Sequence, residues 1–132
     1  MILTCGAFDG IHANHVRYLT EAASFGVNQC RWVTASVVSD DYIRTAKGHE
    51  PAWNQVERAE AVAGLKRVNG VILEDARGIE AVIRWKRPRL FVKGGDWDYA
   101  SLRQPILDAC EEVGCHIVFT EDFGKHWSDV RF

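Results

Sequence analysis

Residues 2–15 read ILTCGAFDGIHANH, and this stretch decides which fold the rest of the chain can complete. Its first four residues are apolar or small and precede Gly6, a pattern typical of a buried strand. From Ala13 to Phe25 apolar residues recur at helical spacing, and Gly26 follows where a helix commonly ends. The stretch therefore predicts a strand, a tight turn and then a helix.

The same alternation of short apolar runs and helical patterns continues along the chain. Val56, Ala59 and Val62 mark the apolar face of a second helix, with Asn54 as its N-cap and Arg58 on its polar side. Strands that alternate with helices form right-handed βαβ units, which build a parallel sheet covered by helices on both faces. Further strands are expected at 31–38, 70–73, 90–92 and 115–119, and further helices at 54–66, 79–86 and 101–113.

These patterns predict one α/β domain over residues 1–132, a Rossmann-like three-layer α/β/α fold with a five-stranded parallel sheet. In such sheets ligands bind outside the carboxyl ends of the strands, where the strand order reverses. A loop is expected after Ser39 at that edge, with Lys47 in a polar loop together with Gly48, His49 and Pro51. The residues of interest should lie in the loops that follow Cys5, Ser39, Leu73, Val92 and Phe119.

Composition narrows the class of protein. Of 132 residues, 47% are hydrophobic and 26% are charged, as in ordinary globular domains, and the net charge is −2. This charge does not favour nucleic acid as a partner, and no apolar run approaches the roughly 20 residues that span a membrane. The cysteines include no CxxC pair, so we expect reduced cysteines, no protein metal site and a cytoplasmic protein without a leader peptide.

His12 and His15 lie three residues apart at the start of the first predicted helix, hence on one side of it. The free N–H groups and the dipole of a helix N-terminus favour an anion there. Two imidazoles beside that end can donate hydrogen bonds to phosphate oxygens and stabilise the charge of a displacement at phosphorus. Judged as a pair alone, the two histidines also fit a plain surface position or, less well, a metal site.

The turn and its histidines resemble the G-x-F-D-x-x-H-x-G-H signature of the cytidylyltransferase-like nucleotidyltransferases. The segment 39–47 resembles the family segment that ends in a phosphate-binding lysine, here Lys47, and Arg58 resembles the arginine of a family helix. Residues 88–97 are very similar to the P-D-x-x-V-K-G-G-D-[YW] segment of heptose-phosphate adenylyltransferases, and glycerol-phosphate cytidylyltransferases carry a close variant. The resemblance covers nearly the whole chain in the same order.

This resemblance implies a polyphosphate site in which His12, His15 and Lys47 are the catalytic residues. Considered singly, Lys47 also fits a surface charge, Arg58 an ion pair, the 93–97 loop a plain turn, and each tryptophan a core position. The nucleotide-binding residues that the resemblance implies are Gly6, Ala7, Phe8, Asp9, Asn14, Arg58, Lys93, Gly94, Gly95, Asp96, Trp97, Trp127 and Ser128.

Two positions depart from the family pattern. Asn14 stands where the family has glycine, so a side chain occupies a place where the nucleotide usually packs against bare backbone. Near the C-terminus, Ser128 aligns with the serine of the family's G-[IY]-S-T-T segment, whereas both threonines are lost and Asp129 adds negative charge. These departures leave open a nucleotide-binding protein with little or no turnover.

The resemblance implies a reaction in which AMP or CMP passes from ATP or CTP to a sugar phosphate or polyol phosphate, releasing pyrophosphate. The acceptor's phosphate oxygen would attack the α-phosphorus in line, without a covalent enzyme intermediate. Mg²⁺ would bridge the phosphate oxygens, held by substrate and water rather than by a protein cluster. Relatives are commonly dimers, so a homodimer is an expected state.

Overall fold

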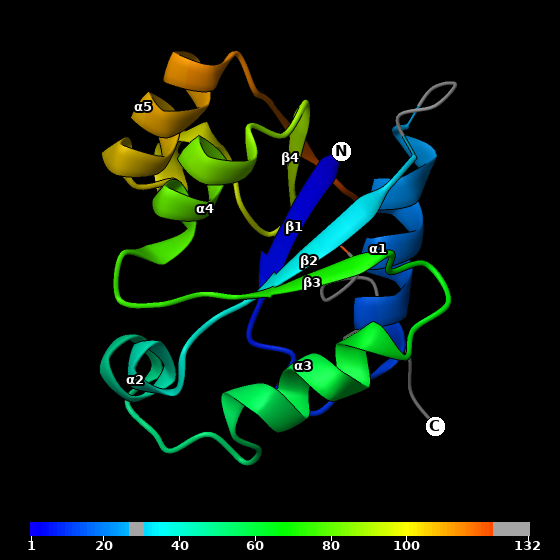
Figure 1. Cartoon of the computed structure of the whole chain (residues 1–132), viewed down its shortest axis with the longest axis vertical. Helices are drawn as coiled ribbons and strands as arrows, with labels where there is room; N and C mark the ends of the chain where they lie inside the picture. The colour runs from blue at the N-terminus through cyan, green and yellow to red at the C-terminus, as the bar shows by residue number, and fades with distance from the viewer. Residues whose placement is uncertain (27–30, 123–132) are drawn as a thin grey trace.

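A five-stranded parallel sheet forms the centre of the computed structural model, which describes residues 1–26 and 31–122 (Figure 1). Its strand order is β3-β2-β1-β4-β5, and all four neighbouring pairs are parallel. The chain moves outward from β1 to β3 and then returns to place β4 beside β1, so the order reverses between those two strands. The strands are β1 (Ile2–Gly6), β2 (Val33–Val37), β3 (Gly70–Leu73), β4 (Leu90–Lys93) and β5 (His116–Phe119).

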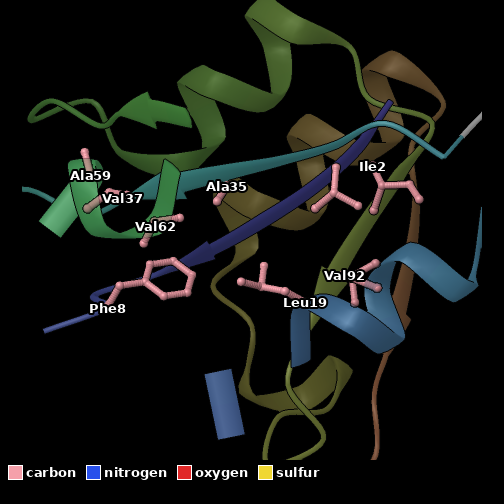
Figure 2. Close-up of a cluster of buried hydrophobic side chains, with 10 residues drawn as sticks. Ile2, Phe8, Leu19, Ala35, Val37, Ala59, Val62 and Val92 are labelled. Carbon is pink, nitrogen blue, oxygen red and sulfur yellow. The ribbon is translucent and has the colours of Figure 1, made fainter. Parts of the chain in front are cut away.

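Helices cover both faces of the sheet, with α1 (Ala13–Ser24) and α3 (Gln55–Ala63) on one side and α4 (Gly78–Lys86) and α5 (Gln104–Val113) on the other (Figure 1). Successive strand residues point to opposite faces. Ile2 therefore packs in the cluster beneath α1 and α3, drawn in Figure 2, whereas Leu3 packs in the cluster beneath α4 and α5. The predicted fold class and the three-layer arrangement are confirmed.

Local sequence signals account for several of the element ends. The predicted N-cap of α3 is confirmed, because Asn54 Oδ1 accepts a hydrogen bond of 2.9 Å from the Glu57 N–H. The helix α4 ends at Arg87, which adopts the left-handed conformation with φ 48° directly before Pro88. Among the described residues, no helix combines the length and the apolar character needed to cross a membrane.

The segment after β2 differs from the predicted polar loop. It forms a short helix, α2 (Asp40–Tyr42), that continues into a π-helical turn, η1 (Ile43–Lys47), and ends at Gly48 with φ 73°. Ser39 Oγ caps α2 by accepting a hydrogen bond of 3.0 Å from the Tyr42 N–H, and Ile43 is its buried anchor. A run this short has too few apolar positions to show helical periodicity, which explains the error.

The helix α5 also starts later than predicted. A 3₁₀ turn, η2 (Tyr99–Ser101), precedes it, because the Asp98 and Ser101 side chains each bond the backbone N–H of the other. Pro105 then lies in the first turn of α5, where its missing N–H costs nothing.

Candidate active site

The loops that follow all five strands surround one cavity of about 1240 Å³, here called the main cavity. It lies at the carboxyl edge of the sheet, where parallel α/β folds bind their ligands. From β1 to β5 along the chain, the lining residues that these loops contribute include Ala7, Ser39, Asp75, Gly94 and Thr120. The structure thus brings together the five loops that the sequence marked as interesting.

His12 and His15 are locked together at the start of α1. His12 is the N-cap, and its Nδ1 accepts a hydrogen bond of 3.2 Å from the Asn14 N–H. In return, His15 Nδ1 accepts one of 3.1 Å from the His12 N–H, and the ring centroids lie 4.0 Å apart. Because each Nδ1 accepts, the proton of each neutral ring must lie on Nε2. Both residues line the main cavity, so the pair supplies two N–H donors at its wall.

The electrostatics of the pair favour a neutral His15. Partial burial lowers its pKa from 6.5 to about 4, and the nearby His12 and Lys47 charges act in the same direction. At neutral pH the His15 ring therefore keeps its Nδ1 lone pair for the His12 N–H and its Nε2 proton for a ligand. Lys47 ends the π-helical turn η1 and is exposed, with its charge available at the same cavity wall.

A smaller cavity of about 270 Å³ lies against the same histidines. Ala7, His12, His15 and Lys47 line both cavities, so the predicted catalytic residues stand between them. The smaller cavity is otherwise lined by Phe8, Asp9, Gly10, Ile43 and His49. A polyanion lying across the histidine pair would meet N–H donors and a lysine from both sides.

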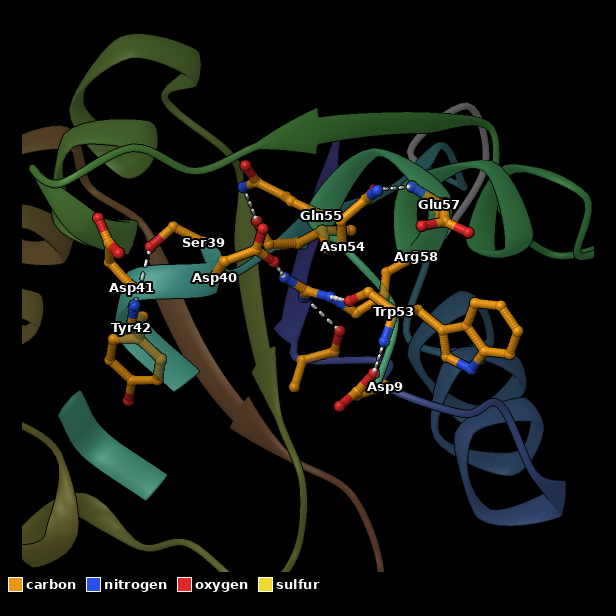
Figure 3. A network of polar contacts seen from close by, with 12 residues as sticks. Asp9, Ser39, Asp40, Asp41, Tyr42, Trp53, Asn54, Gln55, Glu57 and Arg58 are labelled. Atoms are coloured by element: carbon orange, nitrogen blue, oxygen red, sulfur yellow. Dashed lines mark hydrogen bonds and ion pairs between the residues drawn. The ribbon is translucent and has the colours of Figure 1, made fainter. Parts of the chain in front are cut away.

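Arg58 does not lie on the polar face of α3, and that prediction is wrong. The buried face of α3 differs from the predicted apolar face. Arg58 is 1% exposed, whereas Val56, which was predicted on the apolar face, is 57% exposed. Its guanidinium donates to Trp53 O at 2.9 Å, Ala7 O at 2.7 Å and Asp40 Oδ1 at 2.7 Å (Figure 3). These bonds tie the opening turn, the start of α2 and the segment before α3 to one buried cation.

Asp9 makes a second connection between the same segments. Its carboxylate accepts hydrogen bonds from the backbone N–H groups of Ala52 at 2.8 Å and Trp53 at 2.9 Å (Figure 3). Burial alone would raise the pKa of Asp9, but these hydrogen bonds outweigh it and the pKa is lowered. Asp9 and Arg58, both predicted to bind nucleotide, thus act on the loops that carry the histidines.

Phe8 belongs to the core beneath the opening turn, and it also lines the smaller cavity. Its side chain is 2% exposed within the cluster of Figure 2, and its backbone adopts φ 51°, which is uncommon for a residue other than glycine. The Phe8 ring centroid lies 5.4 Å from that of His15, so Phe8 packs against the histidine from the core side. A Cβ on Gly6 would come within 3.1 Å of the Phe8 ring, which explains the glycine there.

The segment after β4 forms the opposite wall. Lys93, Gly94, Gly95, Asp96 and Trp97 all line the main cavity. The Lys93 ammonium lies 4.1 Å from the centre of the Trp97 ring and 3.7 Å from Cys5 Sγ. A hydrogen bond of 3.1 Å from the Trp97 N–H to Gly94 O closes the turn. The cation is thus held by a π face and a thiol.

Gly95 packs too closely against the end of β5 to carry a side chain. A Cβ there would lie 2.2 Å from the backbone oxygen of Thr120. We expect Gly95→Ala to lower the free energy of unfolding by about 1–3 kcal/mol, because backbone atoms must shift to admit the methyl group. Urea unfolding measures this, with Gly64→Ala as the control, since its Cβ would meet Ala61 O at an ordinary 3.5 Å. Equal stability of the two variants would contradict the expectation.

Asn14, which stands in place of the family's glycine, also lines the main cavity. Its Oδ1 is buried without a hydrogen-bond partner among the described residues. The predicted residues Trp127 and Ser128 lie outside the described residues. The sequence did not predict four further residues that line the main cavity: Tyr18, Glu74, Arg103 and Thr120. Glu74 could have been found, because it directly follows a predicted strand and ligands bind at the carboxyl ends of the strands.

Comparisons with known proteins bear on the family and the fold of this chain. A sequence model of the family described as cytidylyltransferase-like matches residues 3–124. A D-beta-D-heptose 1-phosphate adenylyltransferase from Bordetella bronchiseptica is 35% identical over 109 residues, which are 81% of this chain and 65% of that protein. The bifunctional protein HldE of Geobacter sulfurreducens is 37% identical over 98 residues, 74% of this chain but only 19% of that protein.

A solved structure shares the fold. The lipopolysaccharide core biosynthesis protein from Thermoplasma volcanium superimposes with a TM-score of 0.73 at 23% identity, over 91% of this chain and 93% of that one.

Proposed function

The chain belongs to the cytidylyltransferase-like family, and from this premise we propose that it is a nucleotidyltransferase that joins a nucleoside monophosphate to a phosphorylated small molecule. The observation that carries the proposal is the locked histidine pair, which presents two Nε2–H donors between two cavities at the N-terminus of α1. Such donors stabilise negative charge as it develops on phosphate oxygens.

In the proposed reaction the acceptor's phosphate oxygen attacks the α-phosphorus in line. The new P–O bond forms while the bond to the bridging oxygen breaks, and pyrophosphate leaves with the electron pair. His12, His15 and Lys47 would hold the phosphates and stabilise their charge, so catalysis depends on position and electrostatics. When bound, Mg²⁺ would neutralise part of the phosphate charge. We propose that substrate and water would hold this ion.

We propose ATP and a sugar phosphate as the first substrates to test, with CTP and a polyol phosphate second. The name of the D-beta-D-heptose 1-phosphate adenylyltransferase relative supports this order. The chain spans 65% of that protein and 19% of the bifunctional protein HldE, so their activity is a hypothesis for this protein.

Pyrophosphate release tests the reaction. The purified full chain would be incubated with Mg²⁺, ATP or CTP, and a panel of sugar 1-phosphates, including heptose 1-phosphate, and glycerol 3-phosphate. We expect release that requires an acceptor. Tight nucleotide binding with no turnover across the panel would instead favour the second candidate, a nucleotide-binding protein. The half-buried Asn14 side chain in the main cavity, whose Oδ1 has no hydrogen-bond partner among the described residues, is the observation that favours this second candidate.

The protonation of His15 offers a test that does not depend on the acceptor. A bound polyanion stabilises the imidazolium, so pyrophosphate should raise the His15 pKa from about 4 toward neutral values. NMR titration of the ring protons with and without pyrophosphate measures this shift. The His116 ring, at the opposite edge of the sheet, is the internal control and should not respond to the ligand. An unchanged His15 pKa would argue against a phosphate at the pair.

The lowered pKa of His15 also predicts how the free energy of unfolding of the ligand-free protein depends on pH. Because the pKa of His15 in the folded state lies below its ordinary 6.5, its contribution to stability is complete above pH 6.5. That contribution is lost as the pH falls toward about 4.

A further inference from the structure

Glu74 is a buried carboxylate in the wall of the main cavity. It directly follows β3 and is 7% exposed. Its N–H donates to Val37 O at 2.9 Å, and its backbone oxygen accepts from Gln55 Nε2 at 2.7 Å. The side chain accepts one hydrogen bond, from Ser36 Oγ to Oε2 at 2.8 Å. The Glu74 backbone is therefore held on both sides, and one hydrogen bond fixes its carboxylate.

The second carboxylate oxygen of Glu74 has no such partner. Oε1 receives no hydrogen bond from the described residues, and the carboxylate forms no ion pair with any of them. Burial raises the pKa of Glu74, which reflects the cost of holding a charge away from water. Among the described residues, the side-chain atoms buried without a hydrogen-bond partner do not include Glu74 Oε1, so this oxygen is open to the main cavity. A ligand in the cavity can therefore donate a hydrogen bond to it.

Glu74 lies on the β3 side of the main cavity, within reach of the charge of Lys93. The histidine pair follows β1 and Lys93 is the last residue of β4, whereas Glu74 follows β3, the edge strand beyond β2. A nucleotide that lies along the β1 and β4 loops leaves the β2 and β3 side of the main cavity to the acceptor. The rim of that side carries Ser101, Arg103 and Glu80, with an ion pair of 2.8 Å between the last two.

The charges around Glu74 indicate what kind of donor it takes. Lys93 and Arg103 already act on its carboxylate with positive charge, and Glu80, which is paired with Arg103, acts with negative charge. A further ammonium group would meet these cations, whereas a hydroxyl group donates a hydrogen bond without adding charge. Resting on the proposed function, we propose that Glu74 is a specificity-determining residue that accepts a hydrogen bond from a hydroxyl group of a polyhydroxylated acceptor, such as a sugar phosphate.

The variant Glu74→Gln tests this role, because it keeps the shape but removes the charge and turns one acceptor into a donor. We expect kcat/KM for the sugar phosphate to fall about 10- to 100-fold, as for the loss of a hydrogen bond to a charged group. The nucleotide Kd, measured by calorimetry in the absence of acceptor, should stay within about twofold. Ser36→Ala, which frees the carboxylate from its anchor, should lower the same kcat/KM by a smaller factor.

Glu112→Gln is the matched control, since Glu112 lies on α5 outside both cavities and pairs with Arg84 at the surface. Deoxy sugar phosphates add a direct readout: one of them should lose kcat/KM with the wild type and lose little more with Glu74→Gln. A nucleotide Kd that weakens as much as kcat/KM would overturn the proposal. So would a folded variant with unchanged acceptor kinetics, or an effect confined to aminoalcohol phosphates.

Failure of this proposal is distinguishable from failure of the proposed function. If the wild type turns over no acceptor, the proposed function itself fails. If it turns over a sugar phosphate and Glu74→Gln does so equally well, only the role of Glu74 is disproved.

Discussion

Replacing His15 with alanine is expected to lower kcat for nucleotidyl transfer roughly 10²–10³-fold, the loss found when one donor to a developing oxyanion is removed. The reason lies in the geometry of the pair. His15 Nδ1 is occupied by the His12 N–H at 3.1 Å, so the catalytic contribution must come through Nε2. Steady-state kinetics with saturating nucleotide and acceptor would measure the loss.

The same substitution removes a helix cap, so a second variant must separate capping from catalysis. His15→Gln keeps an oxygen at the third helical position, where glutamine commonly completes a capping box. We expect His15→Gln to approach wild-type stability while losing nearly as much kcat as His15→Ala. Activity within about threefold of wild type for His15→Gln would show that the imidazole is not a transition-state donor.

The two histidines should also fail to act independently. His12 Nδ1 accepts from the Asn14 N–H, His15 Nδ1 accepts from the His12 N–H, and the two ring centroids lie 4.0 Å apart. Losing either ring therefore loosens the start of α1 and removes a ring contact of the other histidine. The double variant His12→Ala/His15→Ala should therefore lose less activity than the product of the single losses.

Much of the fold follows from local pattern, because a parallel sheet buries its strands on both faces. The runs around Ile2, Val33 and Phe91 are apolar enough to be recognised without knowing their neighbours. The carboxyl-edge rule then predicts which loops meet, although they are distant in sequence. The π-helical turn before Gly48 escapes this reasoning, because one buried residue, Ile43, is too little to establish a period.

Side-chain roles within the site depend on tertiary contacts that a linear pattern does not contain. The GAFDG turn identifies a ligand loop, yet its Phe8 ring packs inward and its Asp9 bonds the backbone before α3. Charge alone places arginine on the surface, since lone buried cations are rare. Only the carbonyls of Ala7 and Trp53 and the carboxylate of Asp40, which come together in three dimensions, make the burial of Arg58 favourable.

Because Arg58 is buried, its substitution should have the largest effect on stability of any residue outside the catalytic set. Arg58→Ala should lower the free energy of unfolding by about 3 kcal/mol, the lower end for a broken buried pair. The lower end applies because Asp40 is 28% exposed and water can hydrate it once the guanidinium is gone. The carbonyls of Ala7 and Trp53 would lose their donors at the same time. Urea unfolding followed by tryptophan fluorescence would measure the change.

Arg77→Ala supplies the comparison, because the Arg77–Asp75 pair is short, at 2.6 Å, but its side chains are 79% and 56% exposed. Exposed pairs contribute little, so we expect a change within about 1 kcal/mol. Arg58→Lys should fall between the two, since lysine keeps the charge but cannot reach three separate oxygens with one planar group. Below its unfolding transition, Arg58→Ala should still bind pyrophosphate more weakly, because Ala7 lies in the turn that leads to His12. Stability of Arg58→Ala equal to that of Arg77→Ala would contradict the view that one buried cation holds these loops in place.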